Sequence, residues 1–301
     1  MAHNLALERL LVNHKPVLLI GASGAVGGAT LPHLIKAGVR VRALTSSEGS
    51  AARLNALGVT DIVIGDMRVP DDLHAAMDGA GAVHFTPPRF TEDEAEIGKL
   101  VIAVAKDCGT ERFVLTSVLQ PQLSDLPHHR NKLETQEALL NSGLEFVILQ
   151  PAMFMQNLSI EWPRISKDGV YARPYSPDRT MALIDTNDLG EVAAISLIQP
   201  QLAWGTFELC APDRLTHREM AEIIGEELGR PVAAMKRDPS DWQGWAIKNG
   251  WKPWAVHAYL AMCAHYDAHG YVGGNATTLR AILGREPTSY RAFVQRLLQS
   301  V

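Results

Sequence analysis

The chain has 301 residues, 47% of them hydrophobic, and its formal net charge at pH 7 is −5. This length can hold one large domain or two modest ones with a sizeable core. The acidic balance, without a basic block, argues against nucleic acid as the main partner, and no apolar run is long enough to span a membrane. We therefore expect a soluble cytoplasmic protein. A monomer or homodimer is expected.

The cysteines and the N-terminal segment bear on the cellular compartment. Cys108, Cys210 and Cys263 lie far apart and form no CxxC pair, which disfavours both a disulfide framework and a zinc site. Residues 1–15 are too polar, and their apolar part is too short, for a signal peptide. These features indicate a reducing compartment, and no metal is expected.

Short apolar runs alternate with helical patterns in the first half of the chain. Six runs read as strands: residues 16–22, 39–45, 60–66, 81–86, 112–118 and 144–151. Five stretches between them read as helices: residues 24–37, 49–57, 71–77, 92–107 and 129–142. Apolar strands joined by crossover helices are typical of a parallel sheet buried on both faces. The pattern predicts an α/β fold, a Rossmann doubly wound parallel sheet, over residues 1–155.

The pattern changes in the second half, which we predict to be a smaller α/β part over residues 156–301. Residues 156–179 are rich in proline, polar and aromatic residues and read as a long loop region with short elements. Residues 181–199 read as a strand and a helix that return to the Rossmann core. A short strand at "GTFELC", a helix near 217–228, a strand near 231–236 and several C-terminal helices follow.

Three glycines, Gly21, Gly24 and Gly27, follow the first predicted strand with GxxGxxG spacing. The first lets the chain turn sharply, the second lets backbone N–H groups approach a pyrophosphate, and the third lets the helix pack closely on the strand. The alternative is a glycine-rich turn that binds nothing. Because the motif ends a strand and opens a helix, we predict a dinucleotide site. The same turn contains Ser23, Ala25 and Val26.

The end of the second predicted strand bears on the choice between NAD and NADP. An acidic residue there would bind the ribose 2′-hydroxyl and repel a 2′-phosphate. The strand ends instead in Thr45, Ser46 and Ser47, whose hydroxyls are uncharged. Two cations, Arg42 and Arg53, lie nearby in the sequence. We predict NADP, with NAD as the alternative.

Several segments resemble the NmrA-like family of atypical short-chain dehydrogenases/reductases. They are "GASGAVG", "VRALT", "GDMRVPDDLHAAMDGAGAV", "AKDCGTERFVLTSV", "KLETQEALLNSGLEFVILQPAMFMQN", "DTNDLGEVAA" and "ILGREPTSYRAFV". They extend along nearly the whole chain, and the run over residues 132–157 is the most specific. The resemblance implies a Rossmann domain that binds NAD(P) and a small C-terminal part that binds substrate.

The resemblance also implies positions for further cofactor-binding residues. Asp66 and Met67 would lie near the adenine, and the residues Thr86, Pro87 and Pro88 would lie beside the nicotinamide ribose. Pro151 and Phe154, around the end of the sixth predicted strand, complete the expected set. The chain departs from the family pattern at two positions. Ser46 stands where relatives usually carry an arginine, which weakens the NADP prediction, and Ser23 stands where threonine is common.

Reductases of the wider superfamily carry a tyrosine four residues before a lysine on one helix, so both side chains share a face. Here Lys132 is present, and the residue four before it is His128. Ser117 matches the superfamily's active-site serine. An imidazole with a pKa near 6.5 suits general acid catalysis. The alternative is that His128 and His129 are helix-start residues and Lys132 is solvated; metal binding by adjacent histidines is not expected, because they point apart.

Aromatic and sulfur-containing side chains are candidates for substrate contacts. Met153 and Met155 follow the sixth predicted strand, at the edge where such folds bind ligands. Trp242 and Trp245 are three residues apart and suit one helical face. They are expected either to close a small core or to form an aromatic wall over a flat apolar substrate.

Two functions remain open on these residues. The first is an NAD(P)H-dependent oxidoreductase that transfers hydride to a small apolar, aromatic or conjugated acceptor, such as a quinone or an enone. The second is a non-catalytic NAD(P) sensor that binds a partner protein according to cofactor state. The missing tyrosine favours the sensor, whereas Lys132, Ser117 and the tryptophan-rich segment favour the enzyme.

Overall fold

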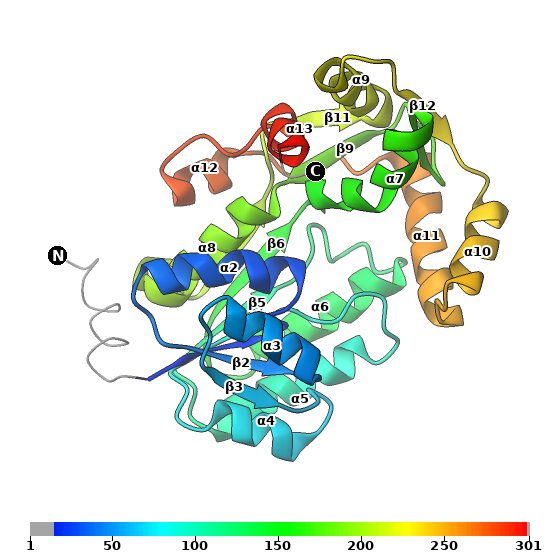
Figure 1. The fold of residues 1–301 in the computed structure, drawn as a ribbon. Coiled ribbons are helices and arrows are strands. Elements are labelled where there is room, and N and C mark those ends of the chain that lie inside the picture. Colours follow the sequence, from blue (N-terminus) through cyan, green and yellow to red (C-terminus); the bar gives the residue numbers. More distant parts are fainter. Residues whose placement is uncertain (1–14, 300–301) are drawn as a thin grey trace.

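The computed structural model describes residues 15–299, so most of the N-terminal segment expected to lack a signal peptide lies outside the described residues. A parallel sheet of seven strands forms the centre of the molecule (Figure 1). Its strands run in the order β10-β6-β5-β4-β1-β2-β3. Their bounds are β1 Val17–Ile20, β2 Val41–Thr45, β3 Asp61–Ile64, β4 Ala82–Phe85, β5 Arg112–Thr116, β6 Glu145–Pro151 and β10 Gly205–Leu209.

The central strand β1 shows why the apolar runs form a sheet buried on both faces. Its four residues are fully or almost fully buried, and their side chains alternate between two cores. Val17 and Leu19 enter one core, and Leu18 and Ile20 enter the other. Successive side chains of a strand point to opposite faces, so a run apolar at every position requires cover on both sides. The predicted fold class is confirmed.

Helices cover both faces of this sheet (Figure 1). One face is covered by α2 Ala25–Lys36, α3 Glu48–Ala56 and α8 Thr186–Ile198. The other is covered by α4 Pro70–Met77, α5 Glu94–Asp107 and α6 Pro127–Leu140. The expected strands and helices of the first half are therefore present, and the strand predicted at "GTFELC" joins the large sheet as β10, parallel to β6.

The segment after β6 differs from the expectation of a long loop region. A short strand β7 Met153–Phe154 and a 3-10 turn η1 Met155–Asn157 lead into an 11-residue helix, α7 Leu158–Asp168. Pro163 lies inside this helix, which is why proline and polar content misled the prediction. Gly169 ends it in the left-handed conformation, with φ 66°.

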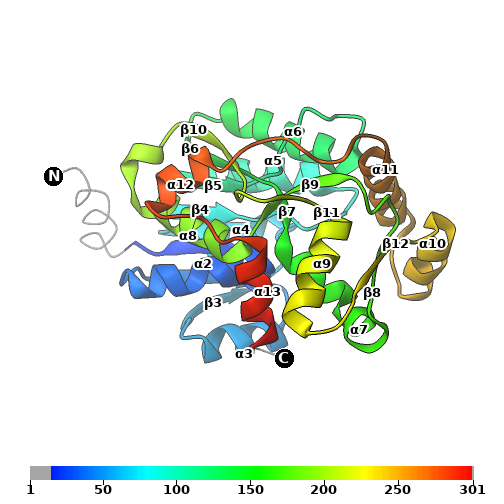
Figure 2. The same cartoon turned by 90° about the horizontal axis from the view of Figure 1, so that it is seen from above.

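The remaining elements form two small sheets and a group of helices beyond the carboxyl edge of the large sheet (Figure 2). The strands are β8 Val170–Arg173, β9 Thr180–Ile184, β11 Arg214–Thr216 and β12 Ala233–Lys236, where β9 pairs with β7 and β11, and β8 with β12. The helices are α9 His217–Leu228, α10 Pro239–Lys248, α11 Pro253–His269, α12 Thr277–Leu283, α13 Tyr290–Leu298 and the 3-10 turn η2 Pro200–Leu202. None of the described helices has the length and apolar character needed to cross a membrane.

Candidate functional site

The glycine turn connects β1 to α2 at the centre of the sheet. Gly21 has φ +93°, a conformation that L side chains rarely adopt. The Gly24 N–H donates to the Gly21 carbonyl over 3.0 Å, which closes the turn. A Cβ on Gly27 would lie 2.4 Å from the same carbonyl oxygen, so the helix approaches the strand more closely than any side chain allows. Two of the three glycines are thus required by the backbone itself.

The start of α2 offers free backbone donors. Gly24 is its N-cap and has no side-chain cap, and residues 23–25 are exposed, whereas Val26 is buried. A Cβ on Gly24 would meet only the Gly21 carbonyl, at 3.2 Å. The hydroxyl of Thr86, at the end of the neighbouring strand β4, is buried and has no hydrogen-bond partner among the described residues. Uncapped N–H groups, open space and the helix dipole fit the pyrophosphate of a dinucleotide.

At the end of β2 a chain of hydrogen bonds links two serines to an arginine. Ser47 Oγ donates to Ser50 Oγ over 3.1 Å, and Arg53 Nη2 donates to Ser50 Oγ over 2.8 Å. Arg42 is committed elsewhere, since its Nε donates to Asp61 over 2.9 Å. Of the two arginines considered, Arg53 therefore has its guanidinium beside the serine-rich strand end.

The remaining residues expected near the adenosine lie at the ends of β2 and β3. Thr45 is buried, and its carbonyl accepts from the Gly65 N–H over 2.9 Å, while Ser46 is exposed. Asp66 accepts from the Arg68 N–H over 2.9 Å through its carboxylate. Met67 packs against the second core. Because β1, β2 and β3 pair in parallel (Figure 1), the ends of β2 and β3 lie at the same edge of the sheet as the glycine turn that follows β1.

Lys132 lies inside the molecule at the start of α6. Its Nζ donates to Glu94 Oε1 over 2.7 Å, and the Glu94 side chain is 1% exposed against 14% for the lysine. Burial raises the pKa of Glu94, and the nearby lysine charge opposes that rise. The reading of Lys132 as a solvated residue is therefore wrong. Glu94 was not among the predicted site residues, because it is 38 residues away from Lys132 in the chain.

His128 does not have the ordinary pKa on which general acid catalysis was predicted. The ring is buried against Phe90, with 5.1 Å between ring centroids. Burial, together with the charges of His129 and Lys132, lowers the His128 pKa to about 2. His128 is therefore neutral at physiological pH. This low pKa disfavours the general-acid role that the sequence predicted for His128.

His129 holds the loop that follows β5. Burial lowers its pKa to about 4, so the ring is neutral, and its Nδ1 lies 2.9 Å from the Gln120 carbonyl oxygen. Nδ1 must carry the proton, because a carbonyl oxygen can only accept. Gln120 and Phe90 both have positive φ, 55° and 49°. The two histidines thus contact the two strained loop residues that follow β5 and β4.

Ser117 lies at the end of a buried line of amides. Gln150 Nε2 donates to Gln136 Oε1 over 2.9 Å, and Gln136 Nε2 donates to Ser117 Oγ over 2.5 Å. All three side chains are buried. Because the serine oxygen accepts this bond, its own O–H remains as a donor. The glutamines were missed, although a glutamine within the apolar run "VILQP" is an unusual residue for a buried strand.

The expected tryptophan wall is divided between the interior and the surface. Trp242 is buried and stacks on Tyr259 with 4.1 Å between ring centroids. Trp245 is 40% exposed, and the Arg237 guanidinium lies 5.7 Å from its ring centroid. Phe90 reaches this group from the Rossmann side, 5.8 Å from the Tyr259 ring. Trp242 therefore has the packing role that was considered as the alternative.

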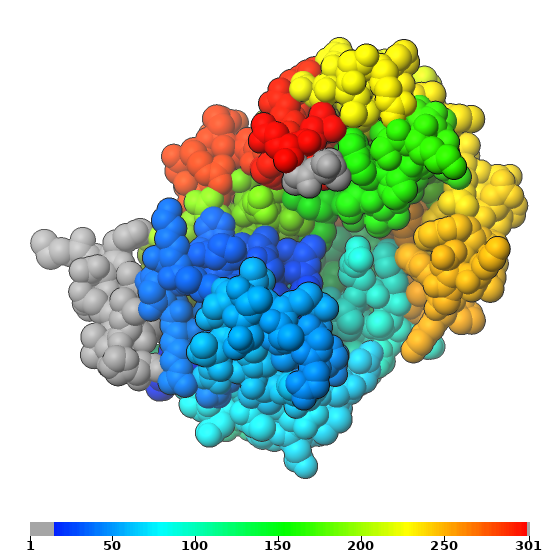
Figure 3. All heavy atoms as spheres, in the orientation of Figure 1, coloured from blue at the N-terminus to red at the C-terminus, as the bar shows by residue number. Residues whose placement is uncertain are grey.

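Further apolar side chains lie where the sheet meets the C-terminal elements. Met153 and Phe154 form β7 and are half-buried, whereas Met155 and Pro151 are buried. Trp251, half-buried, lies 6.2 Å from the Phe90 ring. Figure 3 shows a recess in the surface between the blue atoms of α2 and the green atoms of α7.

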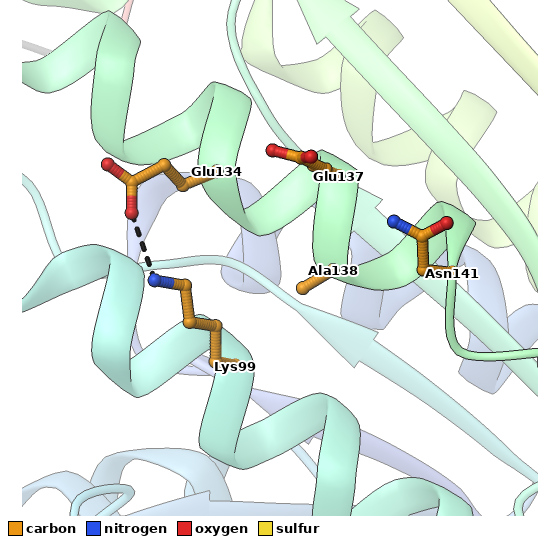
Figure 4. A pocket seen from close by; sticks show the side chains of 5 residues that line it. All are labelled: Lys99, Glu134, Glu137, Ala138 and Asn141. Atoms are coloured by element: carbon orange, nitrogen blue, oxygen red, sulfur yellow. Dashed lines mark hydrogen bonds and ion pairs between the residues drawn. The ribbon is translucent and has the colours of Figure 1, made fainter.

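Other hollows and clusters lie away from this edge. A shallow pocket between the outer faces of α5 and α6 is lined by Lys99, Glu134, Glu137, Ala138 and Asn141 (Figure 4). It lies on the surface of the sheet's helical cover rather than at the strand ends. Within residues 15–299, no three histidine, cysteine or acidic side chains gather in a way that could hold a metal ion.

A doubly wound parallel sheet whose central strand ends in this glycine turn defines the class of Rossmann-type α/β proteins. Residues 13–243 match the NmrA-like family. The chain belongs to that family, as its sequence motifs predicted.

Curated relatives and solved structures agree with this assignment. The NAD(P)H azoreductase of Xenophilus azovorans is 29% identical over 217 residues, which are 72% of this chain and 75% of the relative. The NADPH-dependent quinone oxidoreductase of Escherichia coli, solved with NADPH, has a TM-score of 0.81 at 20% identity, covering 94% and 99% of the two chains. NmrA, a negative transcriptional regulator solved with NAD, has a TM-score of 0.75 at 16% identity over 95% and 96%. At these identities the solved structures share the fold.

Proposed function

We propose that this protein is an NAD(P)H-dependent oxidoreductase that reduces a flat, conjugated and mainly apolar acceptor such as a quinone, an enone or an azo compound. The observation that carries this proposal is the uncapped start of α2 at the glycine turn. It lies beside β1, which pairs with β2 on one side and β4 on the other. Doubly wound sheets bind their ligands outside the strand ends at this reversal of strand order.

The cofactor fits the proposed site along the edge formed by β2, β1 and β4. The pyrophosphate would bind to the free backbone N–H groups of Ala25 and Val26 in the first turn of α2, and Thr86 would offer its unpartnered hydroxyl to the nicotinamide half. Arg53, with Ser46 and Ser47, would receive a 2′-phosphate at the end of β2. When bound, the reduced nicotinamide supplies a hydride. NADP is the proposed cofactor, and NAD also fits a strand end that carries neither a carboxylate nor the usual arginine.

The chain's own polar residues would orient the cofactor and complete proton transfer. An ammonium has three N–H donors; Lys132 gives one to Glu94 and has two others for the ribose hydroxyls. The neutral His128 packs against Phe90 and takes no part as an acid. A quinone that accepts a hydride needs one proton to become a hydroquinone, which Ser117 O–H or solvent would provide.

The acceptor class follows from the side chains around the proposed site. Phe90, Trp251, Met153 and Phe154 are apolar and only half-buried. Flat conjugated molecules suit such surfaces because aromatic rings stack and sulfur contacts adapt to shape. The names of the azoreductase and the quinone oxidoreductase agree with acceptors of this kind.

A second candidate is a non-catalytic sensor of the NAD(P) pool. The observation that favours it is the neutral, buried His128 in the place of the superfamily tyrosine. NmrA, which shares the fold, is a negative transcriptional regulator. Under this reading the cofactor would bind and no acceptor would be reduced.

One experiment separates the two candidates. The protein is mixed with NADPH and a panel of quinones, enones and azo compounds, and NADPH oxidation is followed while calorimetry measures NADPH and NADH binding. Turnover with one acceptor class supports the enzyme. Tight cofactor binding without turnover on any of them supports the sensor, and absence of binding contradicts both.

A further inference from the structure

Two ion pairs join the same helices, α5 and α6, in contrasting surroundings. Lys132 and Glu94 meet over 2.7 Å in the interior, with side chains 14% and 1% exposed. Lys99 and Glu134 meet over 2.9 Å on the outer surface, with side chains 42% and 41% exposed (Figure 4). Exposed pairs contribute little to stability, so the outer pair is a natural control for the inner one.

The inner pair lies next to the loop after β4, which is expected to contact the nicotinamide ribose. Glu94 is the first residue of α5 and directly follows the loop from β4 that contains Thr86 and Phe90. The N-terminal end of a helix favours a negative charge, which helps to keep this buried carboxylate ionised. Lys132 approaches from the second turn of α6. The carboxylate thus lies at the end of the loop that is expected to contact the nicotinamide ribose. The ammonium lies on α6, the helix that resembles the catalytic helix of the superfamily.

Glu94 is the counter-ion of Lys132. The groups that face the pair are Asp93, the neighbour of Glu94, and the neutral rings of His128 and His129. Among these, Glu94 is the group that contacts the lysine. A buried ammonium that loses its counter-ion is desolvated without compensation, which favours its neutral form.

We propose that Glu94 is a positioning residue, which binds the Lys132 ammonium and directs its two remaining N–H donors toward the ribose hydroxyls. This inference rests on the proposed function, in which Lys132 binds the cofactor. Glu94 touches neither the cofactor nor the acceptor; it acts through the lysine. Its carboxylate fixes one of the three ammonium donors and so limits the rotamers of a long, flexible side chain.

The test compares Glu94→Gln with Glu134→Gln. Glutamine keeps the shape and a hydrogen-bonding oxygen but removes the charge that holds the ammonium in place. NADPH affinity, measured by calorimetry, should fall about tenfold or more. The KM for NADPH should rise by a similar factor, whereas the KM for the acceptor should change little. Glu134→Gln should match wild type in both.

Glu94→Asp keeps the negative charge but shortens the reach by one methylene. It should weaken NADPH binding less than Glu94→Gln does, because the counter-ion is retained. This variant also decides the matter if Glu94→Gln does not fold, since wild-type NADPH affinity in Glu94→Asp overturns the proposal. A folded Glu94→Gln with wild-type NADPH affinity overturns it too.

Lys132→Ala separates this inference from the proposed function. If Lys132→Ala impairs NADPH binding while Glu94→Gln is silent, the positioning role fails and the proposed function stands. If Lys132→Ala is silent as well, the lysine does not hold the cofactor, and the assignment of α6 as the cofactor-contacting helix fails with it.

Discussion

The ring of His128 lies 5.1 Å from the ring of Phe90, and this contact joins the start of α6 to the loop that follows β4. Phe90 in turn contacts Tyr259 and Trp251 on the C-terminal side. The histidine therefore belongs to a cluster of aromatic rings, in tilted and edge-to-face contacts, that extends from the start of α6 to α11. Its buried and neutral state suits packing better than proton transfer.

The first prediction concerns this packing role. His128→Ala should lower the free energy of unfolding by about 2–4 kcal/mol, because it leaves a cavity beside Phe90. Turnover should fall by less than tenfold or so, well short of the ~10²–10⁴-fold loss expected when a general acid is removed. Urea unfolding and steady-state kinetics measure the two effects. His128→Phe should recover most of the stability; a large loss of turnover in both variants would restore the general-acid hypothesis.

The second prediction concerns Gly24. Its backbone is extended, with φ −81° and ψ 174°, and an added Cβ would meet only the Gly21 carbonyl. Gly24→Val should therefore fold, because β-branched residues suit extended backbone, yet its side chain would occupy the space proposed for the pyrophosphate. NADPH affinity should fall about 100-fold, or about 2.8 kcal/mol.

Calorimetry on folded protein measures this loss. Gly244→Val on α10, where an added Cβ meets nothing within 4 Å, is the matched control and should bind NADPH normally. Undiminished NADPH binding by a folded Gly24→Val protein would remove the proposed dinucleotide site from the start of α2.

The third prediction concerns the choice between NADPH and NADH. Ser46→Arg should raise the preference for NADPH by about 1–3 kcal/mol through a charge-assisted contact with the 2′-phosphate. Arg53→Ala should reduce that preference, because its guanidinium lies beside Ser47 and Ser50. The ratio of the two dissociation constants measures both effects. Arg40→Ala, which removes an exposed cation paired with Asp61, should leave the ratio unchanged. A wild-type ratio in all three variants would contradict a 2′-phosphate site at the end of β2.

Most of the large sheet could be predicted from its apolar runs, because strands buried on both faces leave few other interpretations. The helix α7 could not, since Pro163 and the polar residues around it resemble a loop until packing against the C-terminal core is known. The pairing of β10 with β6 was equally hidden, because the order of strands at the edge of a sheet is decided by packing between distant segments rather than by local pattern.

The candidate site was predictable only where the chemistry is local. The glycine turn and Lys132 could be read from spacing, whereas Glu94 meets that lysine across 38 residues of chain. The pKa of His128 follows from burial by Phe90 and neighbouring residues, which no single sequence displays. The ring contact with Tyr259 likewise shows that Trp242 packs inward, which its spacing in the sequence could not decide.

The fourth prediction concerns acceptor binding by Phe90. Phe90→Ala should raise the KM for a quinone or azo acceptor by about tenfold, since one aromatic contact is worth about 0.5–1.5 kcal/mol in addition to the buried area. The KM for NADPH should change little. Trp204→Ala, which removes an exposed tryptophan that packs against Phe146, is the control. An unchanged acceptor KM in Phe90→Ala would place the acceptor elsewhere.

The last prediction concerns acid stability. Burial lowers the pKa of His84 and His129 to about 4, of His217 to about 3 and of His128 to about 2. The same side chains in the unfolded chain bind a proton near pH 6.5. Below that pH the unfolded state therefore holds more protons than the folded state, and the free energy of unfolding must fall as the pH falls.

Each of these histidines contributes a slope of up to about 1.4 kcal/mol per pH unit, between pH 6.5 and its own folded pKa. Urea unfolding at pH 7.5, 6.0 and 5.0 measures the total. His84→Gln, which can keep the hydrogen bond to Thr116, should reduce the slope by the contribution of one histidine, up to about 1.4 kcal/mol per pH unit. The exposed His257→Gln should not. A free energy of unfolding that stays constant from pH 7.5 to 5.0 would mean that these rings are protonated in the fold, and His128 would again be available as an acid.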